Sequence, residues 1–541
     1  MSKALAIALV TLSVSSAAFA QGTLPPPAQS CEKLAQLTLP HVKIAAAQNI
    51  AGGAFTPPAG ATVRPDADPA LFKSLPPFCR VVADSAPSSD SDIKIELWLP
   101  LQGWNGRLQA QGNGGFAGEI DFQLLGFAIR HGYAASGTDT GHAGRVTDAS
   151  WALNHPEKIT DYAYRAIHEM TTIAKAAIKS FYGNNPSHSY FAGCSNGGRQ
   201  ALMEAQRFPD DFDGILAGAP ANYWTHLLSS AVFDAQVTTS DPASYIPAGK
   251  LPAIARAVND ACDARDGVSD GILNDPLQCR FDPAALLCRT GDSDKCLTAP
   301  QVTALKRLYQ GAQDSRGRKI FPGFLPGAEE GPGGWGLWIT GSTPGQSLLF
   351  FFGTGYFSNM VYSNADWDYK SANLEQAVTA ADSKTARFMN ATDPNLKPFQ
   401  SHGGKLILYH GWNDAAISAI NSIDYYNSVV GAMGQQTSSS FIRLYMMPGV
   451  QHCAGGPGPD FIGQPGAPVS ATDPQQNVTL SLEQWVEKGV APNAIIATKF
   501  ADDPAKGVKM TRPLCPYPQS ARYKGSGDPN SAANFVCAPP N

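Results

Sequence analysis

Hydrophobic and polar positions follow a strand–helix rhythm in two separate parts of the chain. In the first part, short apolar runs alternate with longer amphipathic segments, and we expect strands at 93–99, 107–111, 133–137 and 189–192 and helices at 161–181 and 199–207. The second part begins with the strand-like run KLILYHG at Lys405 and continues with a helix at 417–433 and a strand at 441–447. Strands that alternate with helices form largely parallel sheets with helices on both faces. The pattern therefore predicts an α/β fold with a mostly parallel central sheet.

Between these two parts lies a long segment of different character. Residues 221–394 are rich in glycine, proline, aromatic residues and cysteine, and they lack the strand–helix rhythm. A domain inserted into a sheet fold has this appearance, and a chain of 541 residues is long enough for more than one folding unit. We expect residues 21–220 and 395–541 to form one domain and residues 221–394 to form an inserted lid.

The first twenty residues (1–20) predict a secretory signal. Lys3 precedes an apolar stretch at 4–14, and small residues end in Ala18-Phe19-Ala20, which suits cleavage before Gln21. A buried N-terminal helix is the alternative, because the stretch is too short to span a membrane. No other segment reaches the roughly 18 apolar residues of a membrane-spanning helix. We expect the mature protein to be secreted or periplasmic and not to associate with a membrane.

The charge balance narrows the class of partner. Charged residues make up 16% of the chain, the formal net charge is −5, and basic residues form no continuous run. This composition gives no electrostatic reason to bind nucleic acid or an anionic membrane. A small neutral substrate fits it better, and the oligomeric state is not predicted.

The ten cysteines predict five disulfides. An even count in an exported chain favours disulfides over free thiols, and no CxxC pair suggests zinc. Three pairs lie close in sequence and are expected to form local bridges, namely Cys262 with Cys279, Cys288 with Cys296 and Cys515 with Cys537. Four cysteines remain, which are Cys31, Cys79, Cys194 and Cys453.

A serine stands between the strand at 189–192 and the helix at 199–207. The residues Gly193-Cys194-Ser195-Asn196-Gly197 match G-x-S-x-G, and a strand before and a helix after are the context that this motif requires. The sharp turn lifts the serine hydroxyl above the sheet, and the N–H of the next residue helps to bind an oxyanion. Ser195 is therefore the candidate nucleophile, and Asn196 a candidate oxyanion donor.

A nucleophilic serine needs a histidine base and an acid that orients it, in the chain order Ser, Asp, His for this kind of fold. Asp414 follows the strand that begins at Lys405, where α/β sheets place their sites. His452 follows the strand at 441–447 and is the only histidine after Asp414. Asp424 is the alternative acid, but it falls inside a predicted helix.

Two cysteines flank these candidates. Cys194 precedes Ser195 and Cys453 follows His452, so an assembled triad would hold the two sulfurs close enough to bond. This bridge would restrict the loop that carries the base, and Cys31 with Cys79 would complete the set. Alternatively, Cys194 is a small buried residue and Cys453 pairs elsewhere, which leaves two cysteines without obvious partners.

The glycine-rich run Gly112-Asn113-Gly114-Gly115-Phe116 follows the strand at 107–111 and has the form of an oxyanion loop. We expect Gly114 or Gly115 to supply the second N–H. The same run satisfies G-x-G-x-x-A through Ala117, and Asp139 lies about 20 residues further on, as in a dinucleotide fingerprint. That alternative leaves the Ser, Asp, His set unexplained, and an exported protein seldom meets a nicotinamide cofactor.

The lid carries three nearby carboxylates, those of Asp263, Asp266 and Asp270. Carboxylate oxygens with glycines that let the chain curl suit a hard cation, and we expect Ca²⁺, although the spacing is not that of an EF-hand. The alternative is an acidic turn that is simply solvated. A disulfide between Cys262 and Cys279 would close this loop.

Taken together, Gly193-Cys194-Ser195-Asn196-Gly197-Gly198, Trp412-Asn413-Asp414 and His452-Cys453 resemble the tannase and feruloyl esterase family, over nearly the whole mature chain. The resemblance implies an α/β-hydrolase fold with a large inserted lid and a serine carboxylesterase that works through an acyl-enzyme. It also implies a structural Ca²⁺ in the lid, bound by the three Asp side chains named above and by the carbonyls of Val268 and Ile272.

The family hydrolyses esters of aromatic acids, which are ferulates, gallates and, in a bacterial branch, the monoester product of polyethylene terephthalate. Residues 320–369 contain no Lys or Arg to hold a second carboxylate, so we expect a feruloyl or similar hydroxycinnamoyl ester, with the other two acids as alternatives. Candidate pocket walls are Trp335, Trp338, Phe357 and Ile417, together with Phe350–Phe352 and Tyr356. A peptidase with the same triad, or a carbohydrate- or polyphenol-binding protein with a vestigial triad, would also fit.

Overall fold

A computed structural model describes residues 26–61, 70–467, 471–502 and 506–539, so the expected signal at 1–20 lies outside it. Its centre is a nine-stranded sheet in the order β1-β2-β3-β5-β4-β6-β7-β8-β9. The strands are β1 (Val42–Ile50), β2 (Phe78–Ser85), β3 (Ile93–Pro100), β4 (Arg107–Gln111), β5 (Ala134–Thr138), β6 (His188–Cys194), β7 (Gly214–Gly218), β8 (Lys405–Gly411) and β9 (Ile442–Met447).

The sheet is mostly parallel. β5, β4, β6, β7, β8 and β9 pair in parallel, whereas β1, β2 and β3 form an antiparallel edge that joins β5. Every strand expected from the sequence is present, with bounds that differ by at most two residues. β1, β2 and β7 were not expected. β7 reads GILAG, a short run without the β-branched enrichment that signals a strand.

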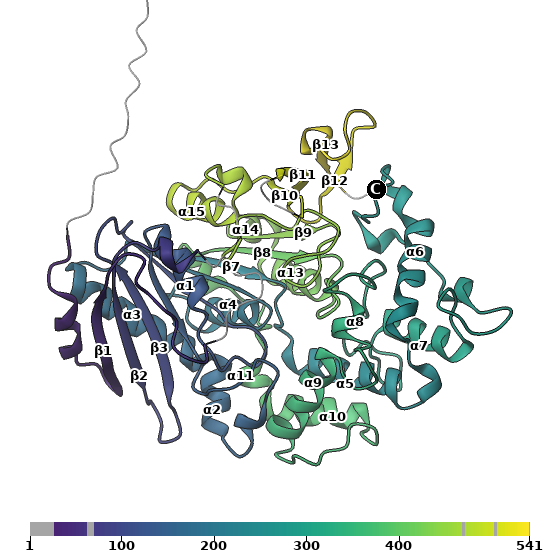
Figure 1. Cartoon of the computed structure of the whole chain (residues 1–541), viewed down its shortest axis with the longest axis horizontal. Helices are drawn as coiled ribbons and strands as arrows, with labels where there is room; N and C mark the ends of the chain where they lie inside the picture. The colour runs from purple at the N-terminus through teal and green to yellow at the C-terminus, as the bar shows by residue number, and fades with distance from the viewer. Residues whose placement is uncertain (1–25, 62–69, 468–470, 503–505, 540–541) are drawn as a thin grey trace, which may run out of the picture.

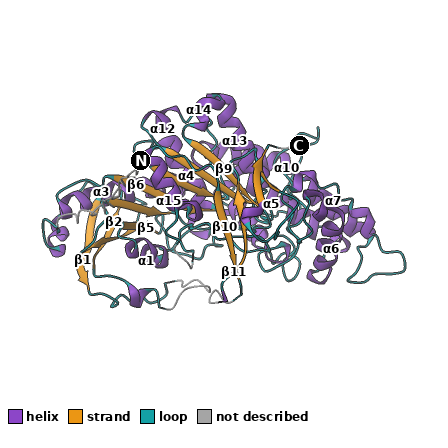
Figure 2. Ribbon diagram, turned by 90° about the horizontal axis from the view of Figure 1, so that it is seen from above, coloured by secondary structure: helices purple, strands orange, loops and turns teal. Residues whose placement is uncertain are grey.

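Helices cover both faces of this sheet (Figure 2). They are α1 (Phe122–Arg130), α2 (Pro156–Thr160), α3 (Ala166–Tyr182), α4 (Asn196–Arg207), α5 (Trp224–Thr239), α6 (Leu251–Cys262), α7 (Ala299–Gln310), α8 (Trp335–Trp338), α9 (Leu348–Gly355), α10 (Leu374–Ala381), α11 (Arg387–Met389), α12 (Lys397–Ser401), α13 (Ile420–Met433), α14 (Gln435–Ser439) and α15 (Val478–Lys488).

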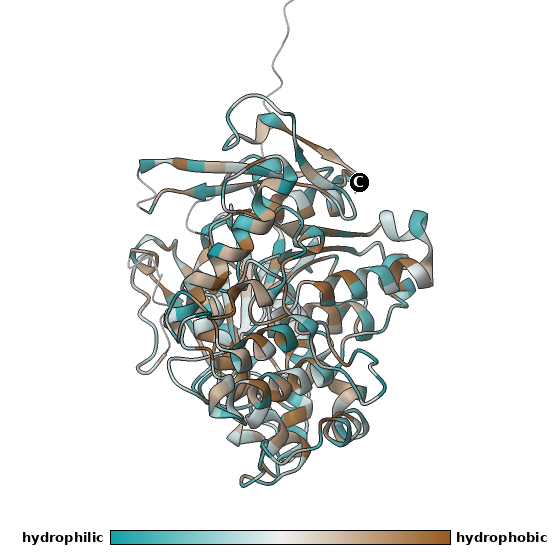
Figure 3. Cartoon of the chain, turned by 90° about the vertical axis from the view of Figure 1, so that its right-hand side faces the viewer, coloured by the Kyte–Doolittle hydropathy of each residue, from teal (hydrophilic) through white to brown (hydrophobic). Residues whose placement is uncertain are grey.

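The helices that flank the sheet bury one side and expose the other. In α3, residues spaced three or four apart are buried, among them Ile167, Met170, Ala174 and Ile178, and a left-handed Gly183 ends the helix. Brown and teal stretches accordingly alternate along the helices in Figure 3. The helix expected at 161–181 begins instead with a π-helical turn, η4 (Asp161–Arg165).

The residues between β7 and β8 contribute no strand to the sheet. They contain α5 to α12 and lie beside it, in teal and green in Figure 1. Part of this segment has a hydrophobic core of its own, with Val258, Leu305 and Trp335 among its buried residues. This arrangement is that of an α/β-hydrolase sheet with a large insertion, as expected, while the domain bounds at 220/221 and 394/395 stay predictions.

The chain ends in two antiparallel hairpins, β10 (Ile495–Phe500) with β11 (Val508–Leu514) and β12 (Ser520–Tyr523) with β13 (Phe535–Ala538). Within the described ranges, no helix combines the length and apolar character needed to cross a membrane.

All ten cysteines are bonded in the expected pairs. The disulfides are Cys31–Cys79, Cys194–Cys453, Cys262–Cys279, Cys288–Cys296 and Cys515–Cys537. Disulfides persist in oxidising compartments, so this set favours a location outside the cytoplasm.

Candidate active site

Ser195 occupies the turn between β6 and α4 in a backbone conformation that side-chain-bearing residues rarely adopt, with φ 65° and ψ −122°. The turn is tight enough to require its glycines. A Cβ on Gly193 would lie 2.6 Å from the carbonyl carbon of Gly197, and a Cβ on Gly198 would lie 2.3 Å from the carbonyl oxygen of Gly218. This strained strand-to-helix turn presents the serine at the end of the sheet.

Asp414 and His452 follow neighbouring strands and are in contact. His452 Nδ1 lies 2.7 Å from Asp414 Oδ2, and the other carboxylate oxygen accepts the amides of Ala416 and Ile417 at 2.8 and 2.9 Å. The Asp414 side chain is fully buried. Burial alone would raise the pKa of Asp414, but the adjacent His452 and His410 hold it well below its ordinary value. Asp424, the alternative acid, is an exposed residue of α13.

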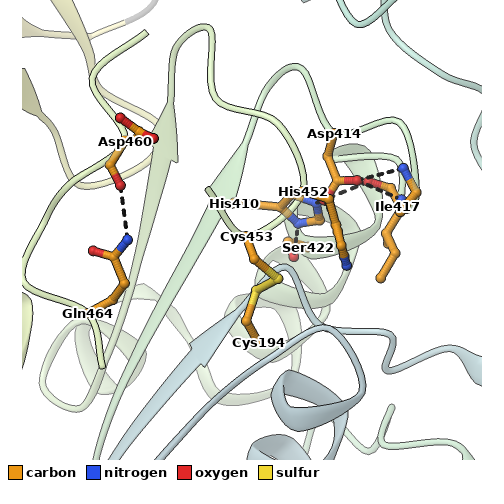
Figure 4. The surroundings of a disulfide bond; sticks show 10 residues. Cys194, His410, Asp414, Ile417, Ser422, His452, Cys453, Asp460 and Gln464 are labelled. Atoms are coloured by element: carbon orange, nitrogen blue, oxygen red, sulfur yellow. Dashed lines mark hydrogen bonds and ion pairs between the residues drawn. A yellow bond between two sulfur atoms is a disulfide. The ribbon is translucent and has the colours of Figure 1, made fainter. Parts of the chain in front are cut away.

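The disulfide between Cys194 and Cys453 joins the turn of Ser195 to the loop of His452 (Figure 4), with 5.9 Å between the two Cα atoms. Ser195 and His452 line one cavity of about 730 Å³. Among the described residues, no hydrogen bond joins the Ser195 side chain to that of His452, whose ring bonds to Asp414. In ligand-free hydrolases this bond is often long and tightens only when substrate binds.

The glycine-rich loop after β4 lines the same cavity. Its Asn113 and Phe116 amides are already bonded, to Gln200 Oε1 at 2.9 Å and to the Val146 carbonyl at 2.7 Å. The amides of Gly114 and Gly115 are therefore the loop's candidate oxyanion donors. A Cβ on Gly115 would lie 2.4 Å from the Val146 oxygen, so only glycine fits there.

Asn196 begins α4, where the first amides have no acceptor within the helix and the helix dipole is positive. Its backbone can thus supply a donor opposite the glycine loop.

Two buried residues that the sequence did not single out connect these donors. The Tyr162 hydroxyl donates to the Gly115 carbonyl at 2.8 Å and lies 3.1 Å from Asn196 Oδ1. Arg199 Nε donates to the same Asn196 oxygen at 2.8 Å. Both side chains are completely buried. Tyr162 belongs to the π-helical turn, and a periodic pattern gives no sign of such a contact.

The dinucleotide alternative is wrong for this loop. A dinucleotide fingerprint places its glycines at the start of a helix, whereas α1 begins only at Phe122. Asp139, which would bind a ribose, is instead buried, and one of its carboxylate oxygens accepts the amides of Lys94 and Gly141 at 3.0 and 2.8 Å.

Aromatic side chains of the inserted segment line the cavity beside His452. Trp338 lies edge-on to the His452 ring with 4.8 Å between centroids, and Leu348 and Phe352 line the cavity beside it. The lining also includes polar side chains, among them Gln111 and Gln123.

Three of the residues expected to line the pocket do not. Trp335 is fully buried in the core of the inserted segment, where its ring packs against Tyr309 and Phe324. Phe357 packs against Trp367, and Ile417 is buried, with its backbone amide bonded to Asp414. Phe350, Phe351 and Tyr356 are also absent from the lining, whereas Phe352 belongs to it. Trp335 and Trp338 are three residues apart in a single-turn helix, and the sequence did not indicate which of them faces the cavity.

The only Lys or Arg that lines the cavity is Arg130, within the described part of the chain. It is an exposed residue at the end of α1, outside the inserted segment.

The acidic loop of the inserted segment, which carries Asp263, Asp266 and Asp270, has the oxygen donors that a hard cation needs but not their arrangement around an ion. Burial, together with the nearby carboxylates of Asp270 and Asp263, raises the pKa of Asp266 to about 6. The oxygens are nevertheless engaged, since Asp266 accepts the Val268 amide at 3.0 Å and Asp270 pairs with Arg512 at 2.8 Å. In the described ranges no group of three such side chains is arranged as metal ligands. The donor chemistry suits calcium, and a coordination cluster is not formed.

The chain matches the family model described as tannase and feruloyl esterase over residues 79–538. It is 42% identical over 537 residues to an uncharacterised esterase of Xanthomonas campestris pv. campestris, which covers 94% of this chain and 91% of the relative. It is 34% identical over 462 residues to a probable feruloyl esterase B-1 of Aspergillus fumigatus, covering 83% of this chain and 84% of that protein.

Among solved structures, feruloyl esterase B from Aspergillus oryzae superposes with a TM-score of 0.85 at 31% identity, covering 94% of this chain and 99% of that one. The serine at a strand-to-helix turn and the Asp–His pair after β8 and β9, the last two strands of the central sheet, agree with what these relatives indicate. The chain belongs to the tannase and feruloyl esterase family and is a carboxylic ester hydrolase.

Proposed function

We propose that the protein is an exported feruloyl esterase that hydrolyses hydroxycinnamoyl esters through an acyl-enzyme on Ser195. The observation that carries this proposal is the aromatic wall of Trp338 and Phe352 beside His452, in a lid face without a cation. A planar, uncharged aromatic acyl group suits such a wall, because ring–ring contacts add to the burial of apolar surface.

In the proposed reaction, His452 takes the Ser195 proton as the hydroxyl oxygen attacks the ester carbonyl. Asp414 keeps the Nδ1 proton in place and stabilises the imidazolium. The amides of Asn196 and of Gly114 or Gly115 bind the oxyanion. His452 then protonates the departing alcohol, and a water activated by the same base releases the acid from Ser195.

The cationic group nearest the cavity favours one alternative substrate. Arg130 at the end of α1 could hold the free carboxylate of a terephthalate monoester. Its exposure makes it a weaker anchor than a buried arginine, because water screens an exposed ion pair. The galloyl group of gallate esters remains the third candidate acyl group.

We also propose that the inserted segment binds a structural Ca²⁺ through Asp263, Asp266 and Asp270, with the Val268 and Ile272 carbonyls completing the set. The ion would hold the loop together and supply no group to the reaction.

The experiment that tests the assignment uses wild type and Ser195→Ala on methyl ferulate, with a fluorophosphonate probe as an independent report of an activated serine. Hydrolysis and labelling are expected for the wild type and neither for the variant. Retained hydrolysis by a folded Ser195→Ala would contradict the nucleophile. Labelling without hydrolysis of any ester would indicate a binding protein, and faster cleavage of matched amides would indicate a peptidase.

A further inference from the structure

His410 lies beside the Asp–His pair although it precedes Asp414 in the chain and so falls outside the Ser, Asp, His order. It is the penultimate residue of β8, and its side chain is fully buried. His410 Nε2 lies 3.1 Å from Asp414 Oδ2, the oxygen that also contacts His452 Nδ1 at 2.7 Å. One carboxylate oxygen thus lies between two imidazoles (Figure 4).

The neighbours of the ring decide which nitrogen carries the proton. Nε2 faces two acceptors, since the Ile417 carbonyl also lies 3.1 Å away. Nδ1 lies 2.7 Å from the hydroxyl of Ser422 on α13, which can donate to it. A neutral ring with its proton on Nε2 therefore satisfies every contact, and it places no second cation in this buried site.

We propose that His410 is a positioning residue of the triad, which donates its Nε2–H to Asp414 Oδ2. The amides of Ala416 and Ile417 fix only the other oxygen of the carboxylate. The bond from His410 fixes the oxygen that faces the base. It also withdraws electron density from that oxygen, so that the carboxylate stays ionised while His452 carries the proton from Ser195. This inference rests on the proposed triad and not on the identity of the acyl group.

A residue that only supported the fold would change stability but not the chemistry of the base. Without the bond from His410, Asp414 Oδ2 becomes a stronger acceptor and stabilises the His452 imidazolium more. Because activity needs neutral His452, the acidic limb of the pH profile of kcat/KM is expected to move to higher pH.

The test compares His410→Leu, His410→Gln and Ser422→Ala with the wild type. His402→Gln is the matched control, since His402 lies before β8 and contacts Asp210 and Asp213 at the surface. We expect His410→Leu to lower kcat roughly 10- to 100-fold, the size of a lost hydrogen bond to a charged group, with KM changed less than about twofold. Glutamine can donate from a similar reach and should restore most of kcat. Ser422→Ala, which leaves the ring unanchored, should fall between them.

The rate of fluorophosphonate labelling gives a second readout that needs the base but no particular ester. The labelling rate therefore tests the role of His410 independently of the substrate. The proposed function fails instead if the wild-type protein is labelled but hydrolyses no aromatic ester. A folded His410→Leu with wild-type labelling, kcat and pH profile would overturn the inference. If His410→Leu does not fold, the other two variants decide. The inference is overturned if His410→Gln and Ser422→Ala both have the labelling rate and pH profile of the wild type. It is also overturned if His410→Gln is impaired as severely as an Asp414 variant.

Discussion

Cys194 and Cys453 are bonded to each other, and each is the chain neighbour of a proposed catalytic residue. The disulfide spans 259 residues of sequence and ties the turn of Ser195 to the loop of His452. Within the described residues, the His452 side chain makes a single hydrogen bond, which is to Asp414. The bridge is therefore placed to set the distance between nucleophile and base.

We predict that Cys194→Ser with Cys453→Ser lowers kcat on the order of 10²-fold, because a displacement of about 1 Å in a reacting group has an effect of this size. The matched control is Cys31→Ser with Cys79→Ser, which removes a disulfide from the far edge of the sheet. Both double variants should lose stability. Equal kcat losses in the two would show that the bridge acts through stability alone.

The Tyr162 hydroxyl contacts both segments that supply the proposed oxyanion donors, the glycine-rich loop at Gly115 and the start of α4 at Asn196. Tyr162→Phe keeps the ring and removes this link, so we predict a loss in kcat of about tenfold with little change in KM. Tyr182→Phe is the control, because Tyr182 is also buried and donates to a carbonyl, that of Pro100, away from the site. Steady-state kinetics on one ester compares them, and matched losses would argue against a role for Tyr162.

Phe352 and Phe351 are neighbours with different surroundings. Phe352 lines the cavity and packs against Trp338, whereas Phe351 is 37% exposed. We predict that Phe352→Ala raises KM for methyl ferulate about tenfold, through lost burial of the acyl ring. It should change KM for methyl butyrate much less. Phe351→Ala should leave both values near those of the wild type; a reversed pattern would place the acyl group elsewhere.

Calcium binding should depend on pH through Asp266. Its pKa is raised to about 6, so in the metal-free protein the folded state binds a proton more readily than the unfolded state. The proton therefore stabilises the fold below about pH 4, and this contribution is lost as pH rises through about 6. A cation needs the ionised carboxylate, so added Ca²⁺ should raise Tm more at pH 7.5 than at pH 5.

Asp266→Asn should abolish this calcium-dependent rise in Tm. Asp275→Asn is the control, since Asp275 lies in the next turn, where its carboxylate accepts the Leu277 amide and the Gln278 side-chain amide. No rise in Tm for chelator-treated wild type at millimolar Ca²⁺ would contradict the site.

The sequence predicted those elements and turns that are determined by residues adjacent in the chain. KLILYHG forms β8 with the expected bounds, and Ser195 stands in the expected turn because strand, glycines and helix are all local signals. The pairing of His452 with Asp414 could also be predicted, since chain order and the two cysteines limited the choice.

Contacts between distant segments could not be predicted in this way. Chain order excluded His410, which reaches Asp414 from the end of the preceding strand. Tyr162 contacts Gly115 across 47 residues. Trp338 rather than Trp335 faces the cavity because of how the inserted segment packs on the sheet, which a single turn of helix does not reveal.

The measurement that tests the central claim most directly is kcat/KM of the wild type on methyl ferulate, methyl gallate and mono(hydroxyethyl) terephthalate at one pH. The aromatic, cation-free lid wall predicts the highest value for methyl ferulate, by about tenfold or more. A higher value for methyl gallate or for the terephthalate monoester would contradict the assignment as a feruloyl esterase.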